Sequence, residues 1–504
     1  MSSQSAISPT PYDAIRYPGL PYADTHPDRL AATATFHGMT PAPPDRCRVL
    51  EVGCGDGGNL VPMAYGLQAS AFVGIDLAAE AIQAARALAQ RAGVSNVTFE
   101  ELDLAQLPES TGDFDYIIAH GVYSWIPAAV RDALIALIGR HLAPQGVAFV
   151  SYNTYPGCHL RRMVWEMLKF HTAELADSQT RLTEAQALIR LIAHGNARPD
   201  EYTQPLVAEA QRMEERLPAL LFHDDLSPVN DPVYFHEFTD HAARHGLQFL
   251  AEAAFVSSSY AGIAPEARGV LATLDPITRQ QYLDFIKCRR FRETLLCRNE
   301  VDVDRKESPE RLRPLTFTAG RRVRAAPRGG DVSPATAEAP APVDADDRDA
   351  SLMRAILDVL REAAPHALTF DAVVERLRAR QEGGQLLAPE VAHLQAVLLA
   401  SLQAGIVEPH VIAPRLACPP GDRPTSSGVV RAQLTDGDIV TSLWHYPVKV
   451  DDDVAKCLLP LLDGTRDRRE LLASSGNLVG SGTSGAVALE EHLDRLARLG
   501  LLIA

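Results

Sequence analysis

The chain has 504 residues, of which 46% are hydrophobic and 22% charged, and its formal net charge is −16. This length allows several buried cores, so we expect two to four globular domains. The acidic charge excludes a global attraction to nucleic acid or to anionic membranes and favours cationic partners. We therefore expect neither a nucleic-acid partner nor a membrane partner.

The seven cysteines are scattered along the chain without a C-x-x-C pair. Thiols without metal-binding spacing are typical of a reducing compartment, and we expect no metal site. The N-terminus shows no basic-then-apolar signal pattern, and no apolar run approaches the ~18 residues of a membrane span. These features predict a cytoplasmic protein.

Residues 1–45 are rich in proline, tyrosine and small polar residues. Two interpretations are open: a disordered tail, or a lid whose aromatic side chains fold over a binding site. Residues 27–38 carry side chains at helical spacing, and Thr25 or His26 is placed to cap the helix. We expect an N-terminal lid segment.

The next predicted unit, residues 46–157, begins with a buried strand at 48–52 that leads into a glycine-rich turn and a helix. Glycine permits such a tight turn and lets the backbone approach a nucleotide-like ligand at the start of the helix. The turn contains Gly53, Gly55, Gly57 and Gly58. Their spacing does not cleanly match the dinucleotide fingerprint G-x-G-x-x-G.

Three carboxylates mark the ends of successive strands. Glu51 lies next to the turn, where it suits a cationic ligand better than a pyrophosphate. Asp76 follows the strand 71–75, roughly 20 residues after the first glycine, as expected for a carboxylate that binds ribose hydroxyls. Asp103 follows the strand 97–101 and is placed to accept from an adenine amine. The ligand that fits these features is S-adenosylmethionine.

Strands at 114–119 and 146–151 and helices at 78–91 and 128–141 continue the alternation. This pattern is typical of a parallel sheet covered on both faces, with ligands at the carboxyl ends of the strands. Loops at those ends carry aromatic and hydrogen-bonding side chains that we expect to orient a methyl acceptor: Tyr123, Trp125, Asn153 and Tyr155. The alternative is that Trp125 and Tyr155 pack beneath a loop. The N-P-P-Y motif of nucleobase and glutamine methyltransferases is absent after strand 114–119, which disfavours a nucleobase acceptor.

Residues 158–232 show helical spacing and predict a helical insertion or regulatory middle domain. Residues 233–303 are expected to complete the sheet with a helix from Tyr234 to about Gly246 and strands at 247–252 and 293–298. His236 and Glu237 on that helix either face the substrate pocket or brace the insertion.

Residues 304–348 are rich in alanine, proline, glycine and acids, which predicts a flexible linker. Residues 349–504 contain three short helical patterns and then a second small helical module, an arrangement similar to a winged-helix domain. The third helical pattern has no arginine or lysine, so we expect a structural or protein-contact role rather than DNA binding.

Several segments together resemble one family: VLEVGCGDGGNL, FVGIDL, FDYIIAHGVYSWIP, VSYNTYPG, VYFHEF, RRFRETLLCR and LLDGTRDRREL. They are similar to the bacterial class I S-adenosylmethionine-dependent methyltransferases with a regulatory domain, whose rickettsial members methylate lysines of outer membrane protein. The resemblance covers nearly the whole chain. It implies an α/β, Rossmann-like methyltransferase sheet with a helical insertion, a C-terminal α(+β) winged-helix-like domain, a homodimer and transfer to protein lysine.

The resemblance also implies a set of cofactor-binding residues: Glu51, Gly53, Gly55, Asn59, Asp76, Asp103 and His120. One departure from the family pattern lies on the acceptor side, where Cys158 replaces the tryptophan that usually follows Tyr-Pro-Gly.

The sequence therefore predicts an S-adenosylmethionine-dependent methyltransferase that N-methylates lysine side chains of a protein substrate. Two alternatives are a small-molecule N- or O-methyltransferase and a non-catalytic, S-adenosylmethionine-binding regulatory protein. The intact glycine turn with its three carboxylates argues against the non-catalytic alternative. No general base is identifiable from the sequence.

Overall fold

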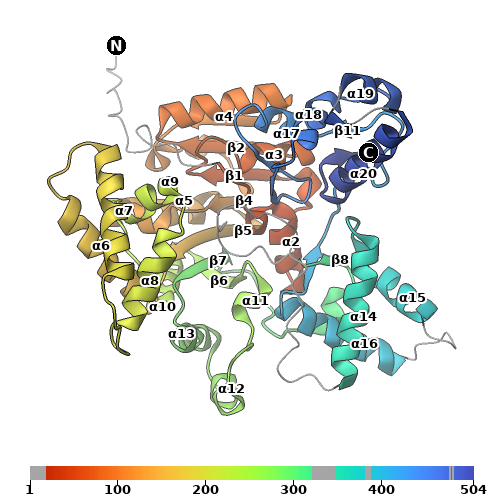
Figure 1. Cartoon of the computed structure of the whole chain (residues 1–504). Helices are drawn as coiled ribbons and strands as arrows, with labels where there is room; N and C mark the ends of the chain where they lie inside the picture. Colours follow the sequence, from red (N-terminus) through yellow and green to blue (C-terminus); the bar gives the residue numbers. More distant parts are fainter. Residues whose placement is uncertain (1–18, 321–346, 381–387, 476–477, 480–481) are drawn as a thin grey trace.

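The computed structural model describes residues 19–320, 347–380, 388–475, 478–479 and 482–504. A central sheet is flanked by helices, the helical insertion lies on one side of it, and the C-terminal modules lie on the other (Figure 1). No helix among the described residues is long and apolar enough to cross a membrane.

The central sheet has seven strands in the order β3-β2-β1-β4-β5-β7-β6. All strand pairs are parallel except those of β7, which runs antiparallel to both β5 and β6. The strands are β1 (Arg48–Val52), β2 (Ala71–Asp76), β3 (Val97–Glu101), β4 (Phe114–Ala119), β5 (Leu142–Asn153), β6 (Leu247–Glu252) and β7 (Phe291–Arg298). The predicted strands are all present, and the Rossmann-like class of the fold is confirmed.

Apolar side chains on both faces of the strands explain why the sheet is buried between helices. In β1, Val49 belongs to one core and Leu50 to the other. The first core packs against the helices α2 (Pro27–Phe36), α3 (Leu60–Gly66), α4 (Ala79–Ala92) and α17 (Gly428–Gln433). The second packs against α5 (Ala128–His141) and α10 (Phe235–Ala243). Such two-sided burial is typical of parallel sheets.

The helical insertion between β5 and α10 has its own apolar cluster, which includes Val164, Leu182 and Met213. Its helices are α6 (Cys158–Thr172), α7 (Ser178–His194), α8 (Gln204–Glu214) and α9 (Pro218–Asp225). Between β6 and β7 lie three further helices: α11 (Phe255–Ser258), α12 (Pro265–Ala272) and α13 (Pro276–Lys287). The helical character predicted for residues 158–232 is confirmed.

The prediction of a flexible linker at 304–348 is wrong for the first part of this range. Residues 309–312 form a short 3-10 helix, and β8 (Thr316–Ala319) pairs with β10 (Val407–His410) and with β9 (Leu368–Thr369). Leu312, Leu315 and Phe317 are buried, so this segment is held by packing that proline-rich composition alone does not reveal. Residues 321–346 lie outside the described part of the chain.

The region predicted as one C-terminal domain contains two modules, each with its own apolar core. The first combines β8, β9 and β10 with α14 (Asp347–Ala363), α15 (Phe370–Arg380) and α16 (Ala388–Gln403). The second contains β11 (Thr425–Ser426), β12 (Ile439–Thr441), β13 (Pro447–Lys449), β14 (Leu502–Ile503), α17, α18 (Asp453–Leu461), α19 (Arg468–Ser474) and α20 (Gly482–Arg498). Both modules pack against the sheet domain, because Phe36 of α2 joins the first core and Val429 of α17 joins a core of the sheet.

Candidate active site

A cavity of about 1000 Å³ opens at the carboxyl ends of β1, β2 and β4. This volume is at the upper end of the roughly 300–1,000 Å³ that ligand pockets occupy. All of the residues predicted to bind the cofactor line this cavity: Glu51, Gly53, Gly55, Asn59, Asp76, Asp103 and His120. The fold thus gathers residues from the carboxyl ends of β1, β2, β3 and β4, and from the turns that follow them, around one space.

The glycine turn has a backbone that other residues rarely adopt. Gly53, Gly55 and Gly57 have φ of +71°, +53° and +74°, which only glycine adopts readily. Asp76 supports the turn, because its Oδ2 accepts a hydrogen bond from Gly55 N at 2.9 Å while its Oδ1 accepts one from Ala78 N at 2.9 Å. The bare backbone at the turn leaves room for a ligand.

Glu51 presents an unsatisfied carboxylate oxygen at the cavity. Its Oε1 accepts a hydrogen bond from Asn59 Nδ2 at 2.7 Å, but its Oε2 is buried and has no hydrogen-bond partner among the described residues. Burial, with a further contribution from Asp76, raises the pKa of Glu51 to about 8. A buried carboxylate without a partner is costly, and a ligand ammonium group would supply that partner.

We predict that cofactor affinity depends on the protonation of Glu51. Because the pKa of Glu51 is raised from 4.5 to about 8, its protonated form stabilises the ligand-free fold at low pH, and this stabilisation is lost as the pH rises through about 8. A cationic ligand needs the carboxylate, so affinity should rise from about pH 6 to about pH 8 with release of a proton, and fall at higher pH as the ligand's own α-amino group, with a pKa of roughly 8, loses its charge. Calorimetry in buffers of different ionisation enthalpy measures that proton. Glu51→Gln should remove this part of the pH dependence, and a wild-type-like profile in Glu51→Gln would contradict the assignment.

His120 lies between the N-terminal segment and β7. Its ring is 3.8 Å from the ring of Tyr22 and 6.4 Å from that of Phe291, centroid to centroid. Burial lowers the pKa of His120 to about 4, so its imidazole is neutral near pH 7. Gly19, Leu20 and Tyr22 also line the cavity. The predicted lid therefore contributes to the wall of the site from residue 19 onward, and residues 1–18 lie outside the described part.

Two of the four predicted acceptor-orienting residues line the cavity. Trp125 and Asn153 both do so, and Asn153 Nδ2 donates a hydrogen bond to Asn230 Oδ1 at 2.9 Å. The indole N–H of Trp125 is buried without a partner among the described residues. Both side chains therefore lie at the cavity, and their role toward an acceptor stays a prediction.

The other two predicted residues lie elsewhere. Tyr123 is 3% exposed, and its hydroxyl is 2.9 Å from His241 Nδ1. The short 3-10 helix Tyr123–Trp125 explains this difference, because residues two apart on such a helix point to different sides. Tyr155 stacks on His159 with centroids 4.1 Å apart, and neither tyrosine lines the cavity. Neither tyrosine is therefore part of the acceptor site that we propose.

Charged residues of the helical insertion form part of the wall and were not predicted as site residues. They are Arg161, Glu209, Arg212, Glu215, Arg216 and Asp224, with Met213 among them. Several are paired: Arg216 bonds Asp224, and Arg290 Nη1 from the loop before β7 lies 3.3 Å from Glu209 Oε2. The spacing of Glu209, Arg212 and Met213 places them on one face of α8, but the same pattern also fits a solvated helix.

His445 is a second residue that the sequence did not reveal. It is in the C-terminal module, 3% exposed, and its Nε2 lies 2.8 Å from Asn59 Oδ1. Burial lowers the pKa of His445 well below its usual value, so the neutral ring donates this hydrogen bond. Its φ of +61° is rare for a residue other than glycine and persists only where the surroundings enforce it. The C-terminal module therefore orients Asn59, and through it Glu51.

We expect His445→Ala to weaken S-adenosylmethionine binding by roughly 3- to 10-fold, the effect of losing one hydrogen bond of about 1 kcal/mol. The KM for S-adenosylmethionine should rise while kcat changes little, because His445 positions Asn59 without touching the acceptor. His366→Ala in the neighbouring C-terminal module is the matched control, since His366 is exposed and bonds Cys418 O. A reduced kcat with an unchanged KM would contradict this positioning role.

Comparisons with known proteins agree with this geometry. Family models match a methyltransferase domain at residues 49–146, a predicted methyltransferase regulatory domain at 218–298 and a PKMT C-terminal winged helix domain at 422–498. An uncharacterized protein of Rickettsia prowazekii is 30% identical over 474 residues, which is 92% of this chain and 85% of that protein. The chain therefore belongs to the same family as this rickettsial protein, and it contains a methyltransferase domain.

The structure of PKMT2 from Rickettsia typhi is similar to this methyltransferase over nearly its full length. The two chains share 25% sequence identity and superpose with a TM-score of 0.83. The match covers 97% of this chain and 100% of PKMT2. PKMT2 has also been solved in complex with AdoHcy. A second Rickettsia prowazekii protein is 32% identical over 243 residues, 47% of this chain and 96% of that protein. This methyltransferase is an enzyme that uses S-adenosylmethionine, as predicted.

Proposed function

We propose that this methyltransferase transfers a methyl group from S-adenosylmethionine to the ε-amino group of lysine in a protein substrate. The observation that carries the proposal is the full-length similarity to PKMT2, which includes the helical insertion and both C-terminal modules. The sequence motifs resemble the protein-lysine methyltransferases, and the similarity is not confined to the cofactor-binding sheet.

The cofactor end of the cavity fits S-adenosylmethionine chemically. In this proposal Asp76 accepts from the ribose hydroxyls, Asp103 from the adenine amine, and the unpartnered oxygen of Glu51 from the ammonium group. A side chain at Gly53 would clash with Val122 beside the turn, since its Cβ would lie 2.7 Å from Val122 Cγ2. When bound, the sulfonium supplies an activated methyl group whose carbon–sulfur bond breaks as the acceptor attacks.

The acceptor end of the cavity has features that suit a lysine. Trp125 and Phe291 offer aromatic faces for an ammonium group, while the carboxylates Glu209 and Asp224 on the same wall are paired with arginines. An apolar, aromatic environment lowers the pKa of an amine, which yields the neutral nucleophile that methyl transfer needs. His120, with a pKa of about 4, is too weak a base to take this proton, so we propose that solvent accepts it. The enzyme's contribution is then alignment and exclusion of water.

We also propose that the protein is a homodimer, as its family resemblance implies. Size-exclusion chromatography with light scattering measures this directly, and a monomer at micromolar concentration would exclude it.

The proposed function is tested with radiolabelled S-adenosylmethionine and a fractionated extract of a strain that lacks this protein. Label should enter the protein fraction and be lost when the lysines of the extract are acetylated beforehand. Label confined to the small-molecule fraction would instead support a metabolite methyltransferase. Cofactor binding without transfer to either fraction would favour a regulatory protein. The Asp76→Ala variant serves as the control for label that does not depend on the active site.

A further inference from the structure

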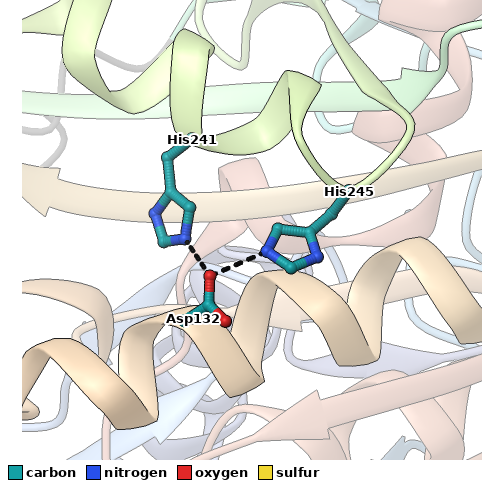
Figure 2. Close-up of side chains that lie close together, drawn as sticks. All are labelled: Asp132, His241 and His245. Atoms are coloured by element: carbon teal, nitrogen blue, oxygen red, sulfur yellow. Dashed lines mark hydrogen bonds and ion pairs between the residues drawn. The ribbon is translucent and has the colours of Figure 1, made fainter.

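Three potential metal ligands converge outside the active-site cavity, between α5 and α10. Asp132 comes from α5, His241 from α10, and His245 from the turn that follows α10. Figure 2 shows both imidazole rings directed at one carboxylate oxygen, with Asp132 Oδ1 3.2 Å from His241 Nε2 and 2.8 Å from His245 Nε2. One ligand atom of each residue lies within 4.8 Å of the other two. Among the residues that the structure describes, this is the one group of three that meets this criterion.

The separations are close to those of a metal-bound set. Zinc bonds of roughly 2.0–2.2 Å to nitrogen and oxygen in a tetrahedral site place neighbouring ligand atoms roughly 3.3–3.6 Å apart. The separations of 2.8 and 3.2 Å are shorter than this, so the side chains would have to move apart by up to about 0.8 Å to admit an ion. Two imidazoles and one carboxylate form a donor set that zinc and similar divalent ions prefer.

The surroundings of the three residues also suit an ion. Tyr123 hydroxyl lies 2.9 Å from His241 Nδ1, and such a bond to the far ring nitrogen fixes the orientation of metal-binding histidines. Asp132 is 59% exposed at its side chain whereas His241 is only 10% exposed, so water can complete the coordination on the open side. Two arginines lie nearby. The charge of Arg131 is compensated by its ion pair with Asp231, whereas the positive charge of Arg244 opposes the binding of a cation.

We propose that Asp132, His241 and His245 form a binding site for a divalent transition-metal ion, with zinc as the expected occupant. The sequence predicted no metal because that expectation rested on cysteine spacing. The histidines are four residues apart, which places them on one side of a helical segment, but their carboxylate partner is more than 100 residues away in the chain. An ion here would join α5 to α10. It would also fix His241 and the Tyr123 hydroxyl bonded to it, and Tyr123 is two residues before Trp125, which lines the active-site cavity.

The test is calorimetric titration of zinc into the tag-free, chelator-treated full chain. We expect one site whose affinity falls more than about tenfold in His245→Ala and in Asp132→Asn. Asp132 is exposed, so its replacement should preserve the fold, which circular dichroism can verify. Tyr123→Phe should weaken binding by roughly 10- to 100-fold, because it removes only the bond to the far nitrogen of His241.

His194→Ala is the matched control, because His194 bonds Glu214 at a similar 2.8 Å distance, and the further partner of that carboxylate is Arg190, which is not a metal ligand. It should leave zinc binding unchanged. Cobalt(II) should give a visible absorption band in the wild-type chain that disappears in His245→Ala. Absence of zinc binding, or binding that both His245→Ala and Asp132→Asn retain, would show that the three residues are only a hydrogen-bonded group.

Discussion

Replacing Asp76 with alanine should weaken S-adenosylmethionine binding by at least about 100-fold. Two hydrogen bonds from ribose hydroxyls to a carboxylate are worth roughly 1.5–3 kcal/mol each, and each 1.4 kcal/mol is about a tenfold change in Kd. The variant also loses the support that Asp76 gives to Gly55 N and Ala78 N. Asp76→Asn keeps an acceptor oxygen for the turn and should bind with intermediate affinity.

Glu101→Ala is the control for Asp76→Ala. Glu101 is opposite Asp76 in the pairing of β3 with β2, yet it is exposed and does not line the cavity. Its replacement should leave the Kd unchanged by isothermal calorimetry. If Asp76→Ala bound the cofactor with wild-type affinity, Asp76 would have no part in the cofactor site.

Replacing Arg292 with methionine should destabilise the sheet domain by roughly 3–5 kcal/mol, the usual effect of removing one partner from a buried ion pair. Arg292 Nη1 lies 2.5 Å from Glu252 Oε1, and its Nε lies 2.8 Å from Asp284 Oδ2, with all three side chains at most 1% exposed. These contacts join β7 to β6 and to α13. Without Arg292, the buried carboxylates of Glu252 and Asp284 keep Arg289 as their one cationic partner among the described residues.

The loss of stability is measured by thermal unfolding. At roughly 2–4 °C per kcal/mol for a domain of this size, the Tm should fall by roughly 6–20 °C. Arg313→Ala is the comparison, because its ion pair with Asp371 is about 70% exposed and exposed pairs contribute at most about 1 kcal/mol. An equal Tm shift in both variants would show that the buried cluster contributes no more to stability than an exposed ion pair does.

The sheet and the cofactor residues could be predicted because their signals are local. Each strand is an apolar run, and each carboxylate or glycine lies at the end of its strand or shortly after it, so the parallel topology brings them to one edge. Glu51, Asp76 and Asp103 accordingly reached the same cavity. Their chemical roles toward the cofactor remain predictions that the variants above test.

The features that the sequence did not reveal depend on contacts between distant segments. His445 meets Asn59 across 386 residues, and no local pattern marks a histidine for that role. Tyr123 and Trp125 are two residues apart in one aromatic loop, but a single turn of 3-10 helix sends the first into the core. The sequence predicts a linker at β8 because only the pairing of this segment with β9 and β10 makes it a strand.

The most direct measurement of the central claim is the chemical identity of the methylated group. Proteins labelled by this enzyme from radioactive S-adenosylmethionine would be hydrolysed to amino acids and separated beside standards. We expect the label to co-migrate with methylated lysine and to be absent when the Asp76→Ala variant replaces the wild-type enzyme. Label that co-migrates with another amino acid, or that leaves as volatile methanol from a methyl ester, would contradict transfer to lysine.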